Sequence, residues 1–235
     1  MVYRRVLLKI TGEAIQGNGK LFERRALDLV AAEIKSVSQK VQLAIVIGGG
    51  NIVRGKDLVE NLETKAVTAD HIGMLATIMN ALTIQDFLER SGLRTRVMTS
   101  IEVNKVAEPY IPRRAVHHLD EGRIIILAAG TGNSGVTTDT AAILRASDVE
   151  ANIVMKGTKV DGVYDRDPNK EPDKAKFLPK ISYNDFLKKG LGGILDRTAV
   201  AQAEMKKMPI FVFNIFEAGN LLRAMEGSAR GSLIN

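Results

Sequence analysis

Three apolar runs of this chain, at residues 6–8, 43–47 and 124–127, each end in a loop that carries glycine. The loops are residues 9–12, 48–51 and 129–138, and the last opens into a helix-like segment at 140–146. A strand that leads through glycine into a helix start exposes backbone N–H groups and a positive helix end, which together bind anions. Glycine also lets a phosphate approach the backbone closely. Three such loops predict a site that holds several phosphates at once.

Short apolar runs alternate with segments of helical period along the chain. The strand candidates are residues 6–10, 43–47, 95–99, 124–128, 153–156 and 210–214. They are rich in Ile and Val and largely apolar on both faces, as in a covered parallel sheet. The helix candidates are residues 27–34, 72–88, 140–146 and 198–207. This alternation predicts an α/β fold, a three-layer αβα sandwich with a mainly parallel central sheet, whose ligands bind at the carboxyl ends of the strands.

The composition bounds the class of protein. Of the 235 residues 45% are hydrophobic, which predicts a single α/β domain or two closely packed lobes. A net charge of +6 admits nucleic acid, an anionic membrane or a small anionic substrate as partner. With 5% aromatic residues and no Trp, base-stacking platforms are poorly supplied, so nucleic acid is not expected as the primary partner. The absence of Cys fits a reducing compartment, and no segment approaches the ~20 apolar residues of a membrane helix, so we expect a soluble, cytoplasmic protein.

Two lysines end apolar runs just before a glycine turn. Lys9 follows residues 6–8, and Lys156 follows residues 153–155. Such a lysine either extends from the strand end into solvent or binds phosphate, and a pair of them would flank a transferring phosphoryl group. Arg54, shortly after the second loop, offers a bidentate fork to phosphate.

Two aspartates lie beside the predicted anion sites. Asp139 follows the third loop, and Asp196 precedes the helix candidate 198–207. A carboxylate next to phosphate is repulsive unless Mg²⁺ or a lysine intervenes. The structural alternatives are a first-turn helix residue for Asp139 and an N-cap for Asp196.

Other polar and sulfur-bearing residues have ordinary structural interpretations. Asp70 is expected to cap the helix candidate 72–88, and the polar segment 164–173 with its two prolines is expected to be a long loop. Four methionines are expected to fill the core: Met74, Met79, Met205 and Met208. A P-loop motif, the dinucleotide-binding glycine motif and the protein-kinase motifs are all absent from the sequence.

These pieces, in this order, resemble the bacterial-type UMP kinases of the amino-acid kinase superfamily. The resemblance spans essentially the whole chain and rests on residues 8–14, 46–51 with 54–55, 69–77, 130–133 with 137–139, 156–168 and 209–214. It implies phosphoryl transfer from Mg·ATP to UMP, giving UDP and ADP, in pyrimidine nucleotide biosynthesis. It also implies one amino-acid kinase domain over residues 1–235, with a nucleoside monophosphate lobe at roughly 1–150 and an ATP lobe at 151–235.

The resemblance assigns residues to three groups. The residues implied in catalysis are Lys9, Asp139, Lys156 and Asp196. The residues implied in ATP binding are Lys9, Ile10, Thr11, Gly12, Gly50, Arg54, Thr158, Tyr164 and Asp167. The residues implied in UMP binding are Gly49, Asp70, Thr131, Gly132, Asn133, Ser134, Gly135, Val136, Thr137 and Thr138. Mg²⁺ would be held mainly by the ATP phosphates.

Regulation and assembly are implied in the same way. The resemblance implies a homohexamer inhibited by UTP, whereas the stretch that accompanies GTP activation is replaced at residues 18–23. The loop of residues 131–138, which the resemblance assigns to UMP and which we call the acceptor loop, also departs from the family pattern. It has Ser134-Gly135-Val136 in place of a proline and aromatic residues, and elsewhere Asn152 stands where Asp is common.

Three other functions stay open at this stage. The same superfamily contains kinases of carboxylates and of carbamate, although this chain is compact for them. A nucleotide-sensing regulator that binds nucleic acid would use the basic surface. A catalytically silent nucleotide-binding subunit would carry an altered loop, but the retained Lys9, Asp139 and Asp196 argue against it.

Overall fold

The computed structural model describes residues 3–168, 170–171, 173–191 and 193–235. In this part of the chain the main sheet has nine strands, namely β1 (Arg5–Ile10), β2 (Gln42–Ile47), β3 (Thr95–Thr99), β4 (Glu108–Pro109), β5 (Ile124–Ala128), β6 (Ile153–Thr158), β9 (Lys180–Ile181), β10 (Ile210–Asn214) and β11 (Gly231–Ile234). Their order is β4-β3-β5-β2-β1-β6-β10-β11-β9. All neighbouring pairs are parallel except β10 with β11.

The central strands form because their side chains are apolar on both faces. All residues of β1, β5 and β6 are buried, as expected for parallel strands covered by helices. Each of the six strands predicted from the sequence is present, and β6 continues two residues further, to Thr158. The sequence prediction missed the two-residue strands and β11, which are too short to show a hydrophobic period.

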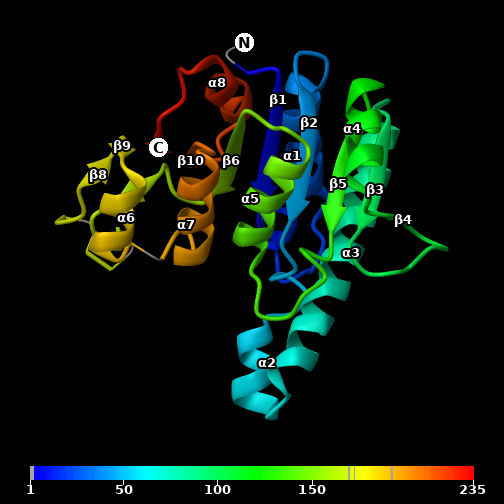
Figure 1. The fold of residues 1–235 in the computed structure, drawn as a ribbon, viewed down its shortest axis with the longest axis horizontal. Coiled ribbons are helices and arrows are strands. Elements are labelled where there is room, and N and C mark those ends of the chain that lie inside the picture. The colour runs from blue at the N-terminus through cyan, green and yellow to red at the C-terminus, as the bar shows by residue number, and fades with distance from the viewer. Residues whose placement is uncertain (1–2, 169, 172, 192) are drawn as a thin grey trace.

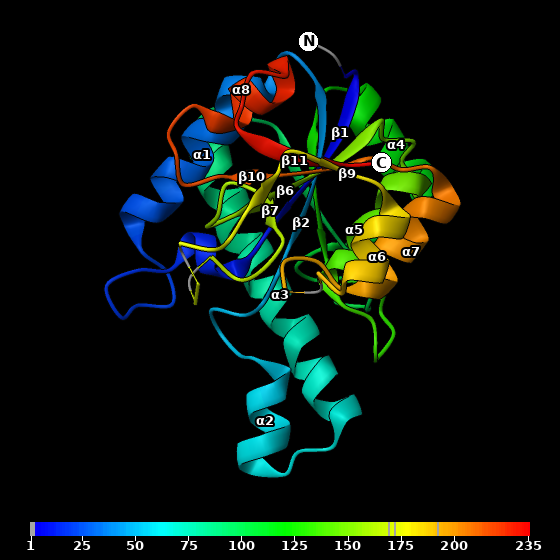
Figure 2. The same ribbon diagram turned by 90° about the vertical axis from the view of Figure 1, so that its left-hand side faces the viewer.

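Two helical layers cover the sheet, as Figure 2 shows. One face carries α1 (Arg24–Ser38), α3 (Ala66–Arg90) and α8 (Asn220–Glu226), whose apolar side chains form one core cluster with the sheet. The other face carries α4 (Pro112–Asp120), α5 (Thr138–Asp148), α6 (Tyr183–Lys189) and α7 (Arg197–Lys206), which form a second cluster. The predicted three-layer αβα sandwich with a mainly parallel sheet is therefore confirmed.

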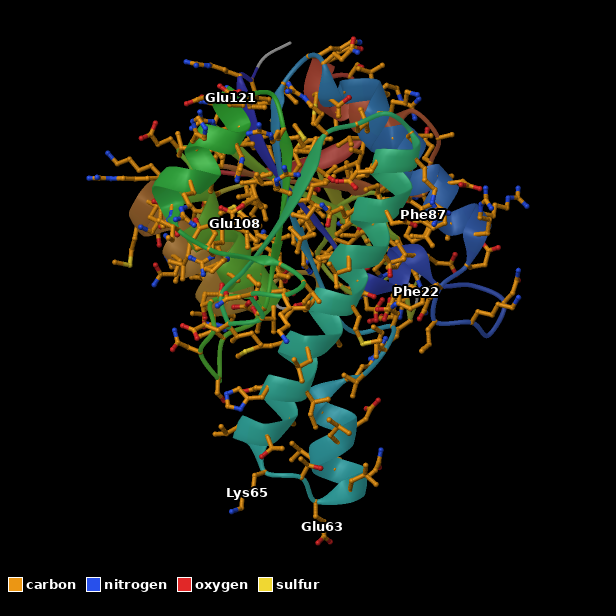
Figure 3. The ribbon with its side chains drawn as sticks, turned by 90° about the vertical axis from the view of Figure 1, so that its right-hand side faces the viewer. Phe22, Glu63, Lys65, Phe87, Glu108 and Glu121 are labelled. Carbon is orange, nitrogen blue, oxygen red and sulfur yellow. The ribbon has the colours of Figure 1, made fainter. Side chains whose placement is uncertain are left out.

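The helix α2 (Gly55–Leu62) and the first turns of α3 project from this body (Figure 1). Figure 3 shows Glu63 and Lys65 at the tip of the projection. The sequence predicted a helix that starts at residue 72, but α3 begins at Ala66, and its N-cap, Lys65, makes no side-chain cap. Asp70 therefore lies inside the helix, and the expectation that it caps the helix was wrong.

The structure corrects two further expectations, one about the four methionines and one about α3. Met74 and Met208 are buried as predicted, but Met79 and Met205 are exposed rather than part of the core. By length and composition, α3 is also a helix able to cross a membrane, which the sequence analysis had not anticipated. It packs against α1, β3 and β5, as the core helix of a globular domain does.

A small hairpin follows the end of β6. Its strands β7 (Val163–Tyr164) and β8 (Phe177–Leu178) pair antiparallel, and Asp165 N–H donates to Lys176 O at 3.0 Å. The predicted long polar loop connects them, although Asn169 and Pro172 lie outside the described residues.

Candidate active site

The three glycine loops gather at one edge of the sheet. Ile10 at the end of β1 is in register with Ile47 of β2, and Val46 of β2 is in register with Leu127 of β5, so the loops after these three strands start at one level. Gly12, in the 3-10 helix η1 (Gly12–Ile15), packs against the second loop: a Cβ there would come within 2.7 Å of Gly48 O. The meeting of these loops was predicted from the sequence and is confirmed.

Two lysines and one aspartate form a buried cluster at this edge. Lys9 and Lys156 are direct neighbours on the adjacent strands β1 and β6. Asp139, in the first turn of α5, reaches both: its Oδ1 lies 2.7 Å from Lys9 Nζ and its Oδ2 lies 2.5 Å from Lys156 Nζ. The side chains are only 7%, 7% and 12% exposed in that order. The cluster therefore concentrates positive charge beside the positive end of a helix.

The charges of the cluster shift one another's protonation. Burial, and next the charge of Lys9, lowers the pKa of Lys156 to about 8. Burial alone would raise the pKa of Asp139, but the two ammonium groups outweigh it and hold that pKa below its ordinary value. At neutral pH the group is Lys⁺–Asp⁻–Lys⁺, with one net positive charge to offer an anion.

Asp196 lies near this cluster, at the start of α5. Its Oδ1 accepts from Ala199 N–H at 2.7 Å, so it is the N-cap of α7 that the sequence allowed. The carboxylate also accepts from the hydroxyls of Thr137 and Thr140. It thus ties α7 to the end of the acceptor loop and the start of α5, and its charge acts on Lys156 from a distance.

A cavity of about 180 Å³ opens between the second and third glycine loops. Its lining combines the two loops with one side of α3 and the start of α5. The lining residues expected to bind UMP are Gly49, Asp70, Thr131, Val136, Thr137 and Thr138. Gly50, expected on the ATP side, lines the same cavity. The structure therefore brings most of the expected acceptor residues together around one space.

The glycines of the second loop differ in how much space the protein leaves for a side chain. A Cβ on Gly49 would come within 2.9 Å of Ala76 Cβ and of Gly73 O on α3, whereas a Cβ on Gly50 would meet nothing within 4 Å. At Gly49, packing against a helix already excludes a side chain, whereas at Gly50 the protein leaves room for one.

Asp70 faces the third loop across the cavity. Its Oδ2 accepts from Gly135 N–H at 2.7 Å and from the Ser134 hydroxyl. The Ser134 hydroxyl and, after it, the Gly135 N–H hold the pKa of Asp70 below its ordinary value. The acceptor loop is thereby attached to α3.

The remaining residues expected to bind ATP are more widely spread. The backbone of Thr11 precedes η1. Thr158 closes the turn after β6 by donating to Val160 O at 2.7 Å. The Tyr164 ring contacts Phe177 edge-on, and Arg54 forms an ion pair with Glu13. None of these side chains is among those lining the described cavity.

Several residues of the site were missed by the sequence analysis. Glu13 binds Arg54 and lies 3.5 Å from Lys159, so it joins two loops. Asn80, fully buried on α3, donates to Gly48 O at 2.7 Å and anchors the second loop. Arg145 of α5 donates to Gly130 O at 3.2 Å. An Asn inside an apolar helix segment was the only available signal, because the other contacts join residues far apart in sequence.

A parallel α/β sheet that brings glycine loops and two buried lysines to one edge defines a phosphate-binding protein. Residues 4–214 match the model of the amino acid kinase family, and the chain belongs to that family.

Solved structures of similar proteins extend over the whole chain. The structure of the UMP kinase from Bacillus anthracis is 40% identical, with a TM-score of 0.95 over 100% of this chain and 97% of that chain. The UMP kinase from Ureaplasma parvum is 30% identical, with a TM-score of 0.93 over all of both chains. The uridylate kinase from Archaeoglobus fulgidus is 25% identical, with a TM-score of 0.76 over 98% of this chain and 100% of that chain.

Proposed function

We propose that this protein is a UMP kinase that transfers the γ-phosphoryl group of ATP to UMP, giving UDP and ADP. The observation that carries the proposal is the buried Lys9–Asp139–Lys156 cluster beside the cavity between the glycine loops. The full-length similarity to two UMP kinases supports UMP as the acceptor.

The chemistry of the acceptor explains why the site needs cations and no general base. A phosphate monoester has a second pKa of about 6, so UMP is mostly dianionic at neutral pH and its oxygen is already nucleophilic. That oxygen bonds to the γ-phosphorus as the bond to the β–γ bridging oxygen breaks and ADP leaves. The obstacle is repulsion between two polyanions, which Lys9, Lys156 and the backbone N–H groups of the loops would offset.

Our assignment of residues to the two substrates follows from their positions. UMP would occupy the cavity between the glycine loops, with Asp70 accepting from its ribose or base and the loop 131–138 surrounding its phosphate. ATP would lie toward β6 and the β7–β8 hairpin, with its phosphates on Lys9, the backbone of 10–12, Gly50 and Arg54. The acceptor would then lie in the lobe of residues 1–150, and the donor would have its nucleoside end on the lobe of residues 151–235 and its phosphates on residues of the first lobe.

Mg²⁺ would enter with ATP and neutralise charge on the β- and γ-phosphates. Within the described ranges, no three His, Cys, Asp or Glu side chains gather into a metal site. Asp139 is engaged by two lysines, and Asp196 by two threonines and a helix end. The donor set therefore fits an ion carried mainly by the triphosphate.

Assembly into a homohexamer, inhibition by UTP and a place in cytoplasmic pyrimidine nucleotide synthesis belong to the same proposal. An exposed apolar strip on α3, made of Val67, Ile72, Leu75 and Met79, supports an association between copies of the chain. Size-exclusion chromatography with light scattering tests the hexamer, and titration of UTP and GTP into the assay tests regulation.

The decisive experiment is ADP formation from Mg·ATP with UMP, CMP, AMP, carbamate or N-acetylglutamate in a coupled assay. We expect turnover with UMP and little with the others. Turnover only with a carboxylate or with carbamate would keep the phosphoryl-transfer chemistry and overturn the acceptor. No turnover with any of them would refute the proposal.

A further inference from the structure

The cavity beside Asp70 is too small for the proposed acceptor. Its volume is about 180 Å³, whereas pockets that bind small molecules measure roughly 300–1,000 Å³. Thr131, Val136 and Thr137 of the acceptor loop (residues 131–138) form one wall. The acceptor loop therefore lies close to α3 across this cavity, and a nucleotide that fills it would need this wall to move outward.

Two hydrogen bonds to one carboxylate oxygen hold the acceptor loop in this position. The Ser134 hydroxyl and the Gly135 N–H both donate to Oδ2 of Asp70, and the second bond is 2.7 Å long. Asp70 is on the second turn of α3, so these bonds tie the loop to the helix where it leaves the body of the protein. These contacts bridge 64 and 65 residues of sequence.

The acceptor loop is anchored at Thr137 and contains two glycines before it. At the fixed end, Thr137 caps α5 by accepting from Thr140 N–H at 3.1 Å and donates to Asp196. Gly132 and Gly135 have φ values of +83° and +77°, a region that glycine enters without strain. The part of the loop before Thr137 is therefore the part whose backbone glycine leaves least restricted.

The Ser134 hydroxyl offers Asp70 the same donor chemistry as a ribose hydroxyl. We propose that Ser134 is a positioning residue. In the empty protein its hydroxyl donates to Asp70 and so holds the acceptor loop against α3. When the acceptor nucleotide enters, one of its hydroxyls replaces that of Ser134 as the donor to Asp70. This inference rests on the proposed function and goes beyond it, because it gives Ser134 a partner in the protein rather than in the ligand.

The test compares Ser134→Ala with Ser134→Thr, which keeps the hydroxyl, and with Ser38→Ala, which removes a remote surface hydroxyl. In the absence of nucleotide, hydrogen exchange of the amides at residues 132–136 is expected to be about tenfold faster in Ser134→Ala alone, since one hydrogen bond to a charged group is lost. By calorimetric titration with UMP alone, Kd is expected to tighten by about tenfold in the same variant.

The outcomes separate this inference from the proposed function. If hydrogen exchange is unchanged in Ser134→Ala, Ser134 does not hold the acceptor loop, whether or not UMP binds, and the inference is overturned. Faster exchange with equal or weaker UMP binding also overturns it, because the hydroxyl would then act on the ligand. Faster exchange in a protein that neither binds nor phosphorylates UMP would keep the loop contact and refute the proposed acceptor.

Discussion

Replacing Asp139 with asparagine removes a negative charge that lies between two buried ammonium groups and keeps the shape of the side chain. The carboxylate oxygens lie 2.7 Å and 2.5 Å from the two lysine nitrogens, at sites that are at most 12% exposed. At an effective dielectric constant of about 20, each attraction amounts to roughly 6 kcal/mol before desolvation is subtracted. Removing one partner of a buried ion pair leaves uncompensated charge and costs about 3–5 kcal/mol. For a domain of this size we expect Tm to fall by roughly 6–20 °C.

Differential scanning calorimetry at pH 7 measures this loss against two reference variants. Asp28→Asn breaks an exposed pair with Arg24 and is expected to cost under about 1 kcal/mol. The double variant Asp139→Asn, Lys156→Met is expected to recover part of the stability, because one of the unpaired cations is gone. Because Asp139 raises the pKa of Lys156, its removal lets Lys156 lose its proton below about pH 8, so the loss should be smaller at pH 8 than at pH 6. A Tm decrease under about 2 °C, or one equal to that of Asp28→Asn, would refute the reasoning.

Three further predictions concern the same edge of the sheet. Gly49→Ala is expected to lose about 1–3 kcal/mol of stability in urea unfolding because its Cβ meets α3, whereas Gly50→Ala stays within about 0.5 kcal/mol, and equal losses would contradict the packing argument. Lys9→Ala is expected to lower kcat by at least about 100-fold in the coupled ADP assay while the circular dichroism spectrum is retained, and a near-wild-type kcat would exclude Lys9 from the reaction. Because the pKa of Lys156 is lowered to about 8, kcat/KM should fall as pH rises through that value. A pH–rate profile that stays flat to pH 10 would contradict this fall in kcat/KM. The folded protein releases the Lys156 proton at a lower pH than the unfolded chain does, so the contribution of Lys156 to stability rises with pH between about 8 and 10.5.

The fold was largely predictable because its signals are local. A parallel strand covered by helices is apolar on both faces, and a run such as residues 124–128 shows this without reference to any other part of the chain. The glycine loops and Lys9 follow such runs directly, so their place at the carboxyl ends of strands could be inferred too. Short elements such as β11 and α8 (Asn220–Glu226) gave no such signal, since four to seven residues show no clear period.

The sequence by itself therefore determined the layers of the protein and the edge of the sheet where its phosphate-binding chemistry lies. Only the tertiary structure decided which residues act together there. Lys9 and Lys156 become neighbours because β6 pairs with β1, a crossover that no local pattern reports. Asp70 reaches Ser134 because α3 starts earlier than its sequence suggests and runs past a loop 64 residues away. Local side-chain patterns select strands and helices, but strand order and helix packing depend on contacts between distant residues, and those contacts set the charges of the site and the position of the loop beside it.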